Sequence, residues 1–215
     1  MSVERPLLMS LPMAREVVAG NKTETRRVVK PDIAHILSVG TPDERNLILE
    51  DCPYGHRGDT FWVRESWRLV DLVEITGGVR VVVEYRAGPR MPRIQYILEE
   101  AKAVDQARRA WAKQGPWKPG IHMPKWACRI HLKITEISAE RVRFINENGV
   151  RREGLKQCTK DGMLYKWGWE GLPWQDWYRG GAVEAFAGLW DSLNAERGYE
   201  WATNPWVWVI CFKRI

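Results

Sequence analysis

The chain has 215 residues, 45% of them hydrophobic, which suffices for one domain with an ordinary core and room for large insertions. Its 33 basic and 27 acidic residues leave a net charge of +6, which favours a phosphate-bearing partner only mildly. Thirteen tryptophans suit either a compact core or a site that stacks on planar rings. No apolar run approaches the ~18 residues that span a bilayer, and the N-terminal apolar patch is too short for a signal peptide. We therefore expect a cytoplasmic protein that does not enter the membrane.

The cysteines form no Cys-x-x-Cys pair, and we expect reduced thiols at Cys52, Cys128, Cys158 and Cys211. The spacings Cys52-x3-His56 and Cys128-x2-His131 could supply four zinc ligands. However, Cys128 and His131 are three residues apart in a run that alternates like a strand, so their side chains should face opposite sides. We therefore predict no metal site and apolar packing of the thiols.

The N-terminal part predicts short elements separated by breaks. Pro12 suits the first position of a helix, and Gly20 suits its left-handed end. The charged run after Gly20 should be extended. In chain order we expect a strand at Leu7–Ser10, helices at Met13–Ala19 and Pro31–Val39, and strands at Asn46–Glu50 and Thr60–Glu65.

The remainder alternates strands with two long excursions. The clearest strand is Val79–Tyr85, and its partner should be Trp67–Glu74, joined through a turn at Gly77-Gly78. Residues 86–118, helical in composition, and residues 156–182, a lid or wall rich in Trp and Gly, are expected as insertions. We also expect a strand at Trp126–Ile137, a short helix within Asn146–Leu155 that stops at Glu153-Gly154, a helix at Ala182–Leu193 and a strand at Trp206–Ile215.

Short strands thus outnumber helices, with long connections between them. This pattern predicts a mainly β or α+β fold: a small, partly open β-barrel with flanking helices, built as a single domain over residues 1–215. A doubly wound sheet does not fit, because no regular strand–helix alternation runs through the chain and no Gly-x-Gly-x-x-Gly follows a strand.

The run AGNKTETRR at residues 19–27 carries the first candidate chemistry. Lysine acts as a base only when its ammonium loses its proton, which burial and nearby positive charge both favour. Arg26 and Arg27 supply the charge, and a neutral Lys22 could then activate the Thr25 hydroxyl as a nucleophile. The alternative is a basic turn that binds phosphate without chemistry. In a regular strand Lys22 and Thr25 face opposite sides, so they converge only if the chain turns just after Gly20.

Glu153, at the expected end of a short helix, is the candidate acid that protonates a leaving amine. Glu147 and Glu65 compete for this role, and a solvated helix glutamate is the alternative. Backbone N–H groups of residues 20–23 could hold an oxyanion.

Two further runs supply candidate binding residues. In YGHRGDTFWVRESW, at residues 54–67, Glu65 could accept hydrogen bonds from a base edge or fix an arginine, and Trp67 could stack on a ring. In PGIHMPKW, at residues 119–126, two prolines stiffen a loop that carries His122 and Trp126. Barrel packing or internal pairing is the alternative for each. The chain has no Gly-x-Ser-x-Gly, HExxH or P-loop signature.

These runs, with RREGL, LWDSLN and NPWVWVICFKRI, resemble the large ASCH-domain proteins of phages and bacteria over nearly the whole chain. The resemblance implies a PUA-like β-barrel with flanking helices. Members of that family include suspected RNA binders, one reported to cut RNA, and amidohydrolases that remove an acyl group from the N4 amine of cytidine.

In those hydrolases a Gly-x-Lys-x-x-Thr run and a Glu carry the chemistry, and the resemblance places these roles on Lys22, Thr25 and Glu153. It implies hydrolysis of N4-acylated cytidine or a related nucleoside, without metal or organic cofactor. Binding of RNA or modified nucleic acid in the same basic cleft, or ribonuclease action, is the alternative. The candidate substrate-binding residues are Arg27, which matches a family Arg, and Arg64, Glu65, Trp67, His122 and Trp126. We expect Lys22, Thr25 and Glu65 to line one cleft of the barrel.

Overall fold

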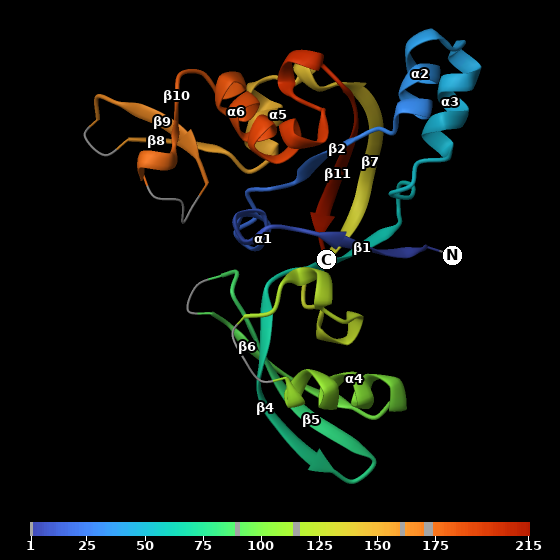
Figure 1. Cartoon of the computed structure of the whole chain (residues 1–215), viewed down its shortest axis with the longest axis vertical. Coiled ribbons are helices and arrows are strands. Elements are labelled where there is room, and N and C mark those ends of the chain that lie inside the picture. Colours follow the sequence, from blue (N-terminus) through green and yellow to red (C-terminus); the bar gives the residue numbers. More distant parts are fainter. Residues whose placement is uncertain (1, 89–90, 114–116, 160–161, 170–173) are drawn as a thin grey trace.

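The computed structural model describes residues 2–88, 91–113, 117–159, 162–169 and 174–215. These residues form eleven strands in three sheets, together with six α-helices and several 3₁₀ turns, so the fold is mixed α/β (Figure 1). No closed barrel occurs among them. Residues 89–90 and 114–116 of the first expected insertion, and 160–161 and 170–173 of the second, lie outside the described residues.

The central sheet has five strands in the order β1-β3-β7-β11-β2. β1 and β3 are parallel, and the other neighbours are antiparallel. The expected C-terminal strand is confirmed, and it lies between β7 and β2 rather than at an edge. The bounds are β1 Glu4–Leu8, β2 Glu24–Val28, β3 Thr60–Arg64, β7 His131–Arg141 and β11 Trp206–Arg214.

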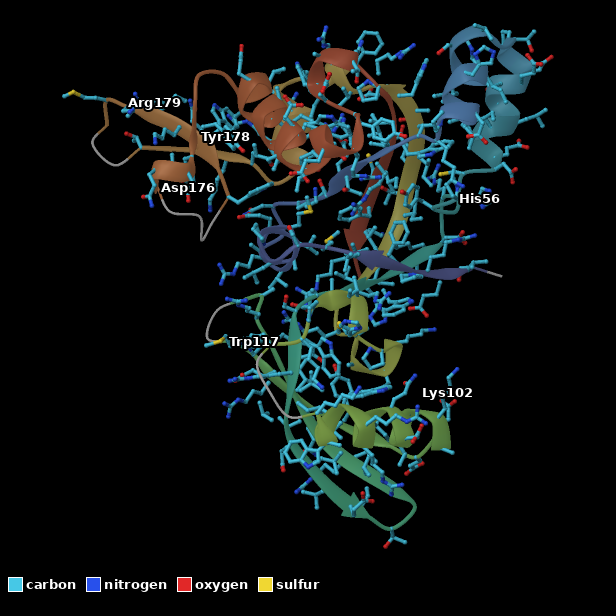
Figure 2. The ribbon with its side chains drawn as sticks, viewed as in Figure 1. His56, Lys102, Trp117, Asp176, Tyr178 and Arg179 are labelled. Atoms are coloured by element: carbon cyan, nitrogen blue, oxygen red, sulfur yellow. The ribbon has the colours of Figure 1, made fainter. Side chains whose placement is uncertain are left out.

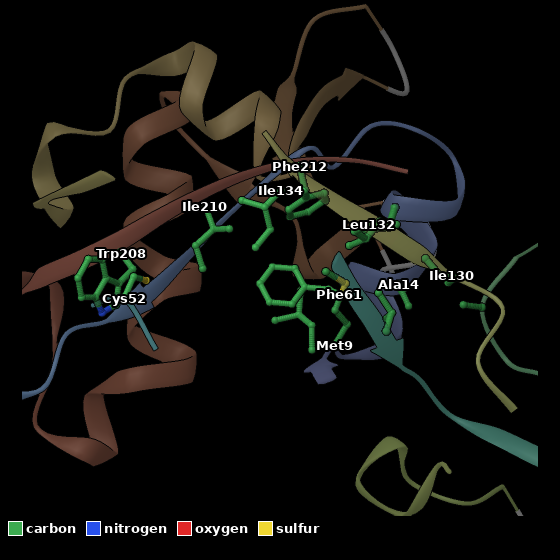
Figure 3. Packing of buried hydrophobic residues seen from close by; sticks show 14 of the residues in the cluster. Met9, Ala14, Cys52, Phe61, Ile130, Leu132, Ile134, Trp208, Ile210 and Phe212 are labelled. Atoms are coloured by element: carbon green, nitrogen blue, oxygen red, sulfur yellow. The ribbon is translucent and has the colours of Figure 1, made fainter. Parts of the chain in front are cut away.

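Both faces of this sheet are covered, which explains why β11 is apolar from Trp206 to Phe212. Trp208 and Ile210 pack into one hydrophobic cluster, with Phe61 and residues of β7 (Figure 3). Val207 and Val209, which alternate with them, pack into a second cluster on the other face. The helices α1 (Leu11–Val18), α2 (Pro31–Val39) and α3 (Pro42–Glu50) contribute to the first cluster, and α5 (Glu147–Arg152) and α6 (Ala182–Asn194) to the second.

The strand expected at Asn46–Glu50 is wrong, because this segment is the second half of helix α3. Thr41 caps the helix: its hydroxyl accepts from the Glu44 N–H, and the Glu44 carboxylate accepts from the Thr41 N–H. This capping box and Pro42 in the first turn fix the helix start, and they outweigh the strand-like alternation of the short apolar run.

A separate lobe holds the strands β4 (Trp67–Ile75), β5 (Gly78–Tyr85) and β6 (Arg93–Leu98) with helix α4 (Ala101–Ala112), around a third hydrophobic cluster (Figure 1). The predicted hairpin β4–β5 is confirmed, with the turn at Gly77-Gly78. Strand β6 lies within residues 86–118, a segment whose composition predicts helix.

The third sheet lies in the second expected insertion: β8 (Lys156–Thr159), β9 (Tyr165–Gly168) and β10 (Tyr178–Arg179). Figure 2 shows Tyr178 and Arg179 on this sheet, beside α6. A Cβ on Gly188 would lie 2.5 Å from the Tyr178 ring, so this glycine lets the sheet approach the helix.

The strand expected from Trp126 begins only at His131, because prolines shape the preceding residues into two 3₁₀ turns, Gly120–His122 and Lys125–Ala127. Cys52 is buried in the first hydrophobic cluster and Cys128 in the third. The described residues bring together no group of three or more His, Cys, Asp or Glu that could hold a metal. Within the same residues, no helix has both the length and the apolar character to cross a membrane.

Candidate active site

The end of helix α1 turns the chain so that Lys22 leaves the strand direction. Gly20 is left-handed, with φ of +80°, and its N–H donates to the Val17 carbonyl at 3.1 Å. The N–H groups of Asn21 and Lys22 both donate to the Glu16 carbonyl, at 2.9 and 3.0 Å. β2 begins only at Glu24, so the alternation of a strand does not apply to Lys22. The chain therefore turns just after Gly20, as it must if Lys22 and Thr25 are to converge.

Helix α5 ends in the same way, beside this turn. Glu153 is its C-cap, and Gly154 follows with φ of +95°. A Cβ on Gly154 would lie 3.0 Å from the Glu16 Cβ and 3.1 Å from the Lys22 Cβ. Only glycine therefore lets the two helix ends meet here, which brings Glu153 to Lys22 across 131 residues of sequence.

The Lys22 ammonium and the Glu153 carboxylate form a buried ion pair through Oε2. Nζ also donates to the carbonyls of Glu24, at 2.7 Å, and Glu153, at 3.0 Å. The other carboxylate oxygen, Oε1, accepts from the Arg26 N–H at 2.7 Å. The Glu24 carbonyl and the Arg26 N–H belong to the two peptide units on either side of Thr25, so the pair is held against the backbone of Thr25.

Burial lowers the pKa of Lys22, although the charge of Glu153 and its hydrogen bond oppose this effect; the positive charge of Arg27 lowers the pKa further. Lys22 is only 2% exposed. In such a site the ionised pair and the neutral pair, amine and carboxylic acid, lie closer in energy than they do in water. A proton can therefore pass between the two side chains.

A network of charged side chains fixes the strand that carries Thr25. Arg26 pairs with Glu24, with Glu140 at 2.9 Å and with Glu153 at 3.5 Å. Arg152 donates to Glu24 at 2.7 Å. Burial by itself would lower the pKa of Arg26, but the charges of Glu153 and Glu24 outweigh it and raise the pKa. Arg26 stays a cation and positions Glu153.

A cavity of about 330 Å³ is lined by Thr25, Arg27 and Glu153. Lys22, which we expected on its wall, is not a lining residue and contacts the site through Glu153. This volume is in the range of small-molecule sites. Helix α6 forms another wall of the cavity. The sequence did not predict it as part of a site, because its apolar stripe indicates core packing. The other lining residues are Leu8, Ser10, Met13, Arg26, Val28, Tyr54, Phe186, Leu189, Trp190, Leu193, Asn194 and Arg197.

The remaining candidate binding residues lie elsewhere. Arg64, Trp67 and His122 line a different cavity of about 330 Å³, and Trp126 lines a third of about 530 Å³. Arg64 donates to the carbonyls of Gly120, at 3.1 Å, and Ile121, and so holds the proline-stiffened loop.

Glu65 does not reach the Thr25 cavity, where we expected it. Its carboxylate binds Arg129 in a bidentate pair, with Nε at 2.8 Å and Nη2 at 2.9 Å, so it fixes an arginine, one of the two roles expected from the sequence. Trp67 is 1% exposed and packs edge-on against Trp126, with 6.1 Å between the ring centroids. Of the candidate run at residues 54–67, Tyr54 lines the Thr25 cavity, whereas Arg64 and Trp67 line a different one.

No protein-family model and no curated protein matches the chain. Among solved structures, the crystal structure of protein EF3133 from Enterococcus faecalis V583, assigned to family model DUF984, aligns with 100% of this chain and 77% of that chain. The identity is 10% and the TM-score is 0.38, which is too low to support any statement about this chain. The interpretation of the site therefore depends on its own geometry.

Proposed function

We propose that the chain is an amidohydrolase that removes the acyl group from N4-acylated cytidine or a related nucleoside. One observation carries the proposal: Lys22 and Glu153 form a buried pair on the two peptide units that flank Thr25, and Thr25 and Glu153 face one cavity. This arrangement supplies a nucleophile, a base and an acid at one place. The ASCH resemblance indicates the same three residues.

The first half of the reaction is acyl transfer to Thr25. A proton passes from Lys22 Nζ to Glu153 Oε2, and Glu153 turns its O–H toward the cavity. The freed lone pair of Nζ accepts the Thr25 hydroxyl proton while Oγ1 attacks the amide carbonyl carbon. The carbon–N4 bond breaks, Glu153 gives its proton to N4, and cytidine leaves with its free amine. Thr25 is then an ester, and the Lys22–Glu153 pair is again ionised.

The second half hydrolyses the ester. Glu153, now a carboxylate, takes a proton from water as the hydroxide adds to the ester carbon. The bond to Oγ1 breaks, the proton held by Glu153 passes to Oγ1, and the carboxylic acid is released. Thr25, Lys22 and Glu153 return to their initial state.

The oxyanion donor differs from the one expected from the sequence. The N–H groups of residues 20–23 already donate to carbonyls of helices α1 and α5, so they are not available. Arg26 lines the cavity, and its buried Nε has no partner among the described residues. We assign the oxyanion to the Arg26 guanidinium, because a cationic group with one N–H still unpaired can stabilise developing negative charge.

In this proposal the central sheet is the counterpart of the PUA-like barrel, in a single domain that carries residues 86–118 and 156–182 as insertions. Two observations support this division of the chain. The second insertion forms a separate small sheet, β8–β10, and the Thr25 cavity is lined by residues of β2 in the central sheet.

The direct test is incubation with N4-acetylcytidine, followed by the absorbance change as cytidine forms. We expect turnover by the natural chain and none above background by Glu153→Gln, which keeps the shape but not the acid. Absence of turnover, with tight and salt-dependent binding of single-stranded RNA, would favour the binding module instead; such binding weakens with a log–log salt slope of about −0.7 per contacted phosphate.

A further inference from the structure

The Thr25 cavity holds more positive charge than the proposed chemistry uses. Its charged lining residues are three arginines and one glutamate: Arg26, Arg27, Arg197 and Glu153. Arg26 and Glu153 belong to the buried network, where each has partners of opposite charge. Two cations, Arg27 and Arg197, remain.

Neither of these two arginines has an ionic partner in the part of the chain that the structure describes. Arg27 donates from Nη2 to the Leu8 carbonyl at 3.0 Å, and its buried Nε has no partner there. Arg197 makes a long contact, 3.5 Å, with the side-chain oxygen of Asn194, and its Cζ lies 5.9 Å from the centre of the Tyr199 ring. The cavity wall thus carries two guanidinium groups whose charge no carboxylate of the described residues pairs with, which favours an anionic ligand.

Arg27 and Arg197 line the same cavity although they come from different elements of the fold. Arg27 is on β2, and Arg197 follows α6. Tyr54 lies on the cavity wall between these contributions: burial raises the pKa of its hydroxyl, and the positive charges of both arginines oppose the rise. Both guanidinium groups therefore act on the Tyr54 hydroxyl, and both line the same cavity.

We propose that the cavity binds a phosphate monoester, so that the substrate is an N4-acylated cytidine monophosphate rather than the uncharged nucleoside. The inference rests on the proposed function for the identity of the base. Guanidinium groups bind phosphate oxygens through paired N–H donors. A monoester carries a charge of about −1.5 to −2 at pH 7, which two arginines match. A phosphodiester in RNA carries less charge per phosphate, so the monoester fits better.

The position also suits one nucleotide. Thr25 and Arg27 are two residues apart on β2, so their side chains share a face and their Cα atoms are about 6.6 Å apart at the usual strand rise. The acylated amine would lie at Thr25 and the phosphate at Arg27 and Arg197, with the nucleoside along the cavity between them.

Two measurements test this inference. The first is calorimetric binding of cytidine and CMP, the reaction products, to the natural chain, to Arg197→Gln and to the control Arg108→Gln. Arg108 is an exposed arginine on α4, paired with Glu74, so the control removes the same charge away from the cavity. The second is kcat/KM for N4-acetylcytidine and for its 5′-monophosphate with the same proteins.

We expect CMP to bind at least about tenfold more tightly than cytidine, since charge-assisted hydrogen bonds contribute on that scale. The ratio should fall several-fold in Arg197→Gln and stay unchanged in Arg108→Gln. Hydrolysis should show the same preference for the monophosphate.

The outcomes separate this inference from the proposed function. Equal binding of CMP and cytidine, with normal hydrolysis of the nucleoside, overturns the phosphate site and leaves the amidohydrolase. A preference for CMP that disappears in Arg197→Gln, without any hydrolysis, supports the phosphate site and overturns the amidohydrolase. A short RNA that binds more than about tenfold tighter than CMP overturns the mononucleotide in favour of a polymer.

Discussion

Two of the buried ion pairs in this molecule each join a basic side chain to a glutamate, but they differ in what they can do. Lys22 pairs with Glu153 beside a cavity, and Arg129 pairs with Glu65 beneath the β4–β6 lobe. All four side chains are mostly buried. Arg129 also donates to the Ala87 carbonyl at 2.6 Å, and its Cζ lies 4.4 Å from the centre of the Tyr85 ring. These contacts enclose the Arg129–Glu65 pair in the protein.

The difference lies in the cation and in access. Lysine can lose its proton when buried, whereas arginine cannot in proteins. The Lys22 pair reaches a cavity through Glu153, whereas Glu65 is not among the residues that line the three described cavities. A buried ion pair therefore marks a candidate catalytic site only when its proton can move and a ligand can reach it; otherwise it holds the fold together.

The largest expected effect comes from exchanging the two cations. Lys22→Arg keeps the charge and removes the transferable proton, so turnover of N4-acetylcytidine should fall by about 10²–10⁴-fold. Arg129→Lys, the reverse exchange at the other pair, should leave kcat within a few-fold. Steady-state kinetics of both variants check this, and a Lys22→Arg protein with normal turnover would contradict the role of Lys22 as a base.

Removal of the nucleophile should be nearly as severe. Thr25→Ala should cost at least ~100-fold in kcat, because the proposed ester forms on the hydroxyl that this change removes. Thr25→Ser should retain part of the activity. Thr23→Ala is the matched control, two residues away and outside the cavity lining, and we expect little change in its kcat. If Thr25→Ala keeps full activity while Lys22→Arg is inactive, Lys22 activates water instead.

The lowered pKa of Lys22 predicts a distinct pH dependence. The working form of the pair holds one proton, so kcat/KM should fall at alkaline pH with a midpoint below 10.5, the ordinary value for lysine. Between the lowered pKa of Lys22 in the folded chain and its ordinary value of 10.5, the unfolded chain holds the Lys22 proton while the folded chain has lost it. The stability of the natural chain relative to Lys22→Met should therefore rise with pH.

Both halves of this prediction can be measured, by pH–rate profiles and by urea unfolding at each pH. An alkaline midpoint at or above 10.5 would show that Lys22 is not perturbed. A stability difference that falls with pH would show that the pKa is raised rather than lowered.

The smallest effect concerns how the pair is assembled. Gly154→Ala adds a Cβ in contact with Glu16 and Lys22 at a left-handed position, and we expect a loss of about 1–3 kcal/mol in unfolding free energy together with reduced kcat. Gly198→Ala has a similar φ of +78° with no atom within 4 Å of the new Cβ, so it should lose stability from strain alone and keep its kcat. Equal kinetics in the two variants would mean that Gly154 does not position Lys22.

The sequence predicted what local signals encode. Gly20 and Gly154 indicated the two helix ends, and both are left-handed in the structure. The hairpin β4–β5 and strand β11 followed from apolar alternation and turn residues. The strand at Asn46–Glu50 failed because a five-residue alternation is weaker than the cap at Thr41.

The contacts between distant segments could not be predicted in this way. Arg26 meets Glu140, 114 residues along the chain, and Glu65 meets Arg129, 64 residues along, through the sheet order β1-β3-β7-β11-β2 and its connections. The α6 wall has the pattern of an ordinary core helix, and nothing local distinguishes the part that faces a cavity. A sequence motif was enough to predict the candidate catalytic residues. Which binding residues lie together is decided by the fold, so the sequence could not predict it.

The most direct measurement looks for acylated Thr25. The natural chain is mixed with N4-benzoylcytidine, quenched in acid within the first turnovers, and analysed by mass spectrometry of the intact chain and of its peptides. The account predicts a mass increase of one benzoyl group, located on Thr25 and absent from Thr25→Ala and Lys22→Arg. Release of cytidine without acylation of Thr25, or an acyl group on another residue, would contradict it.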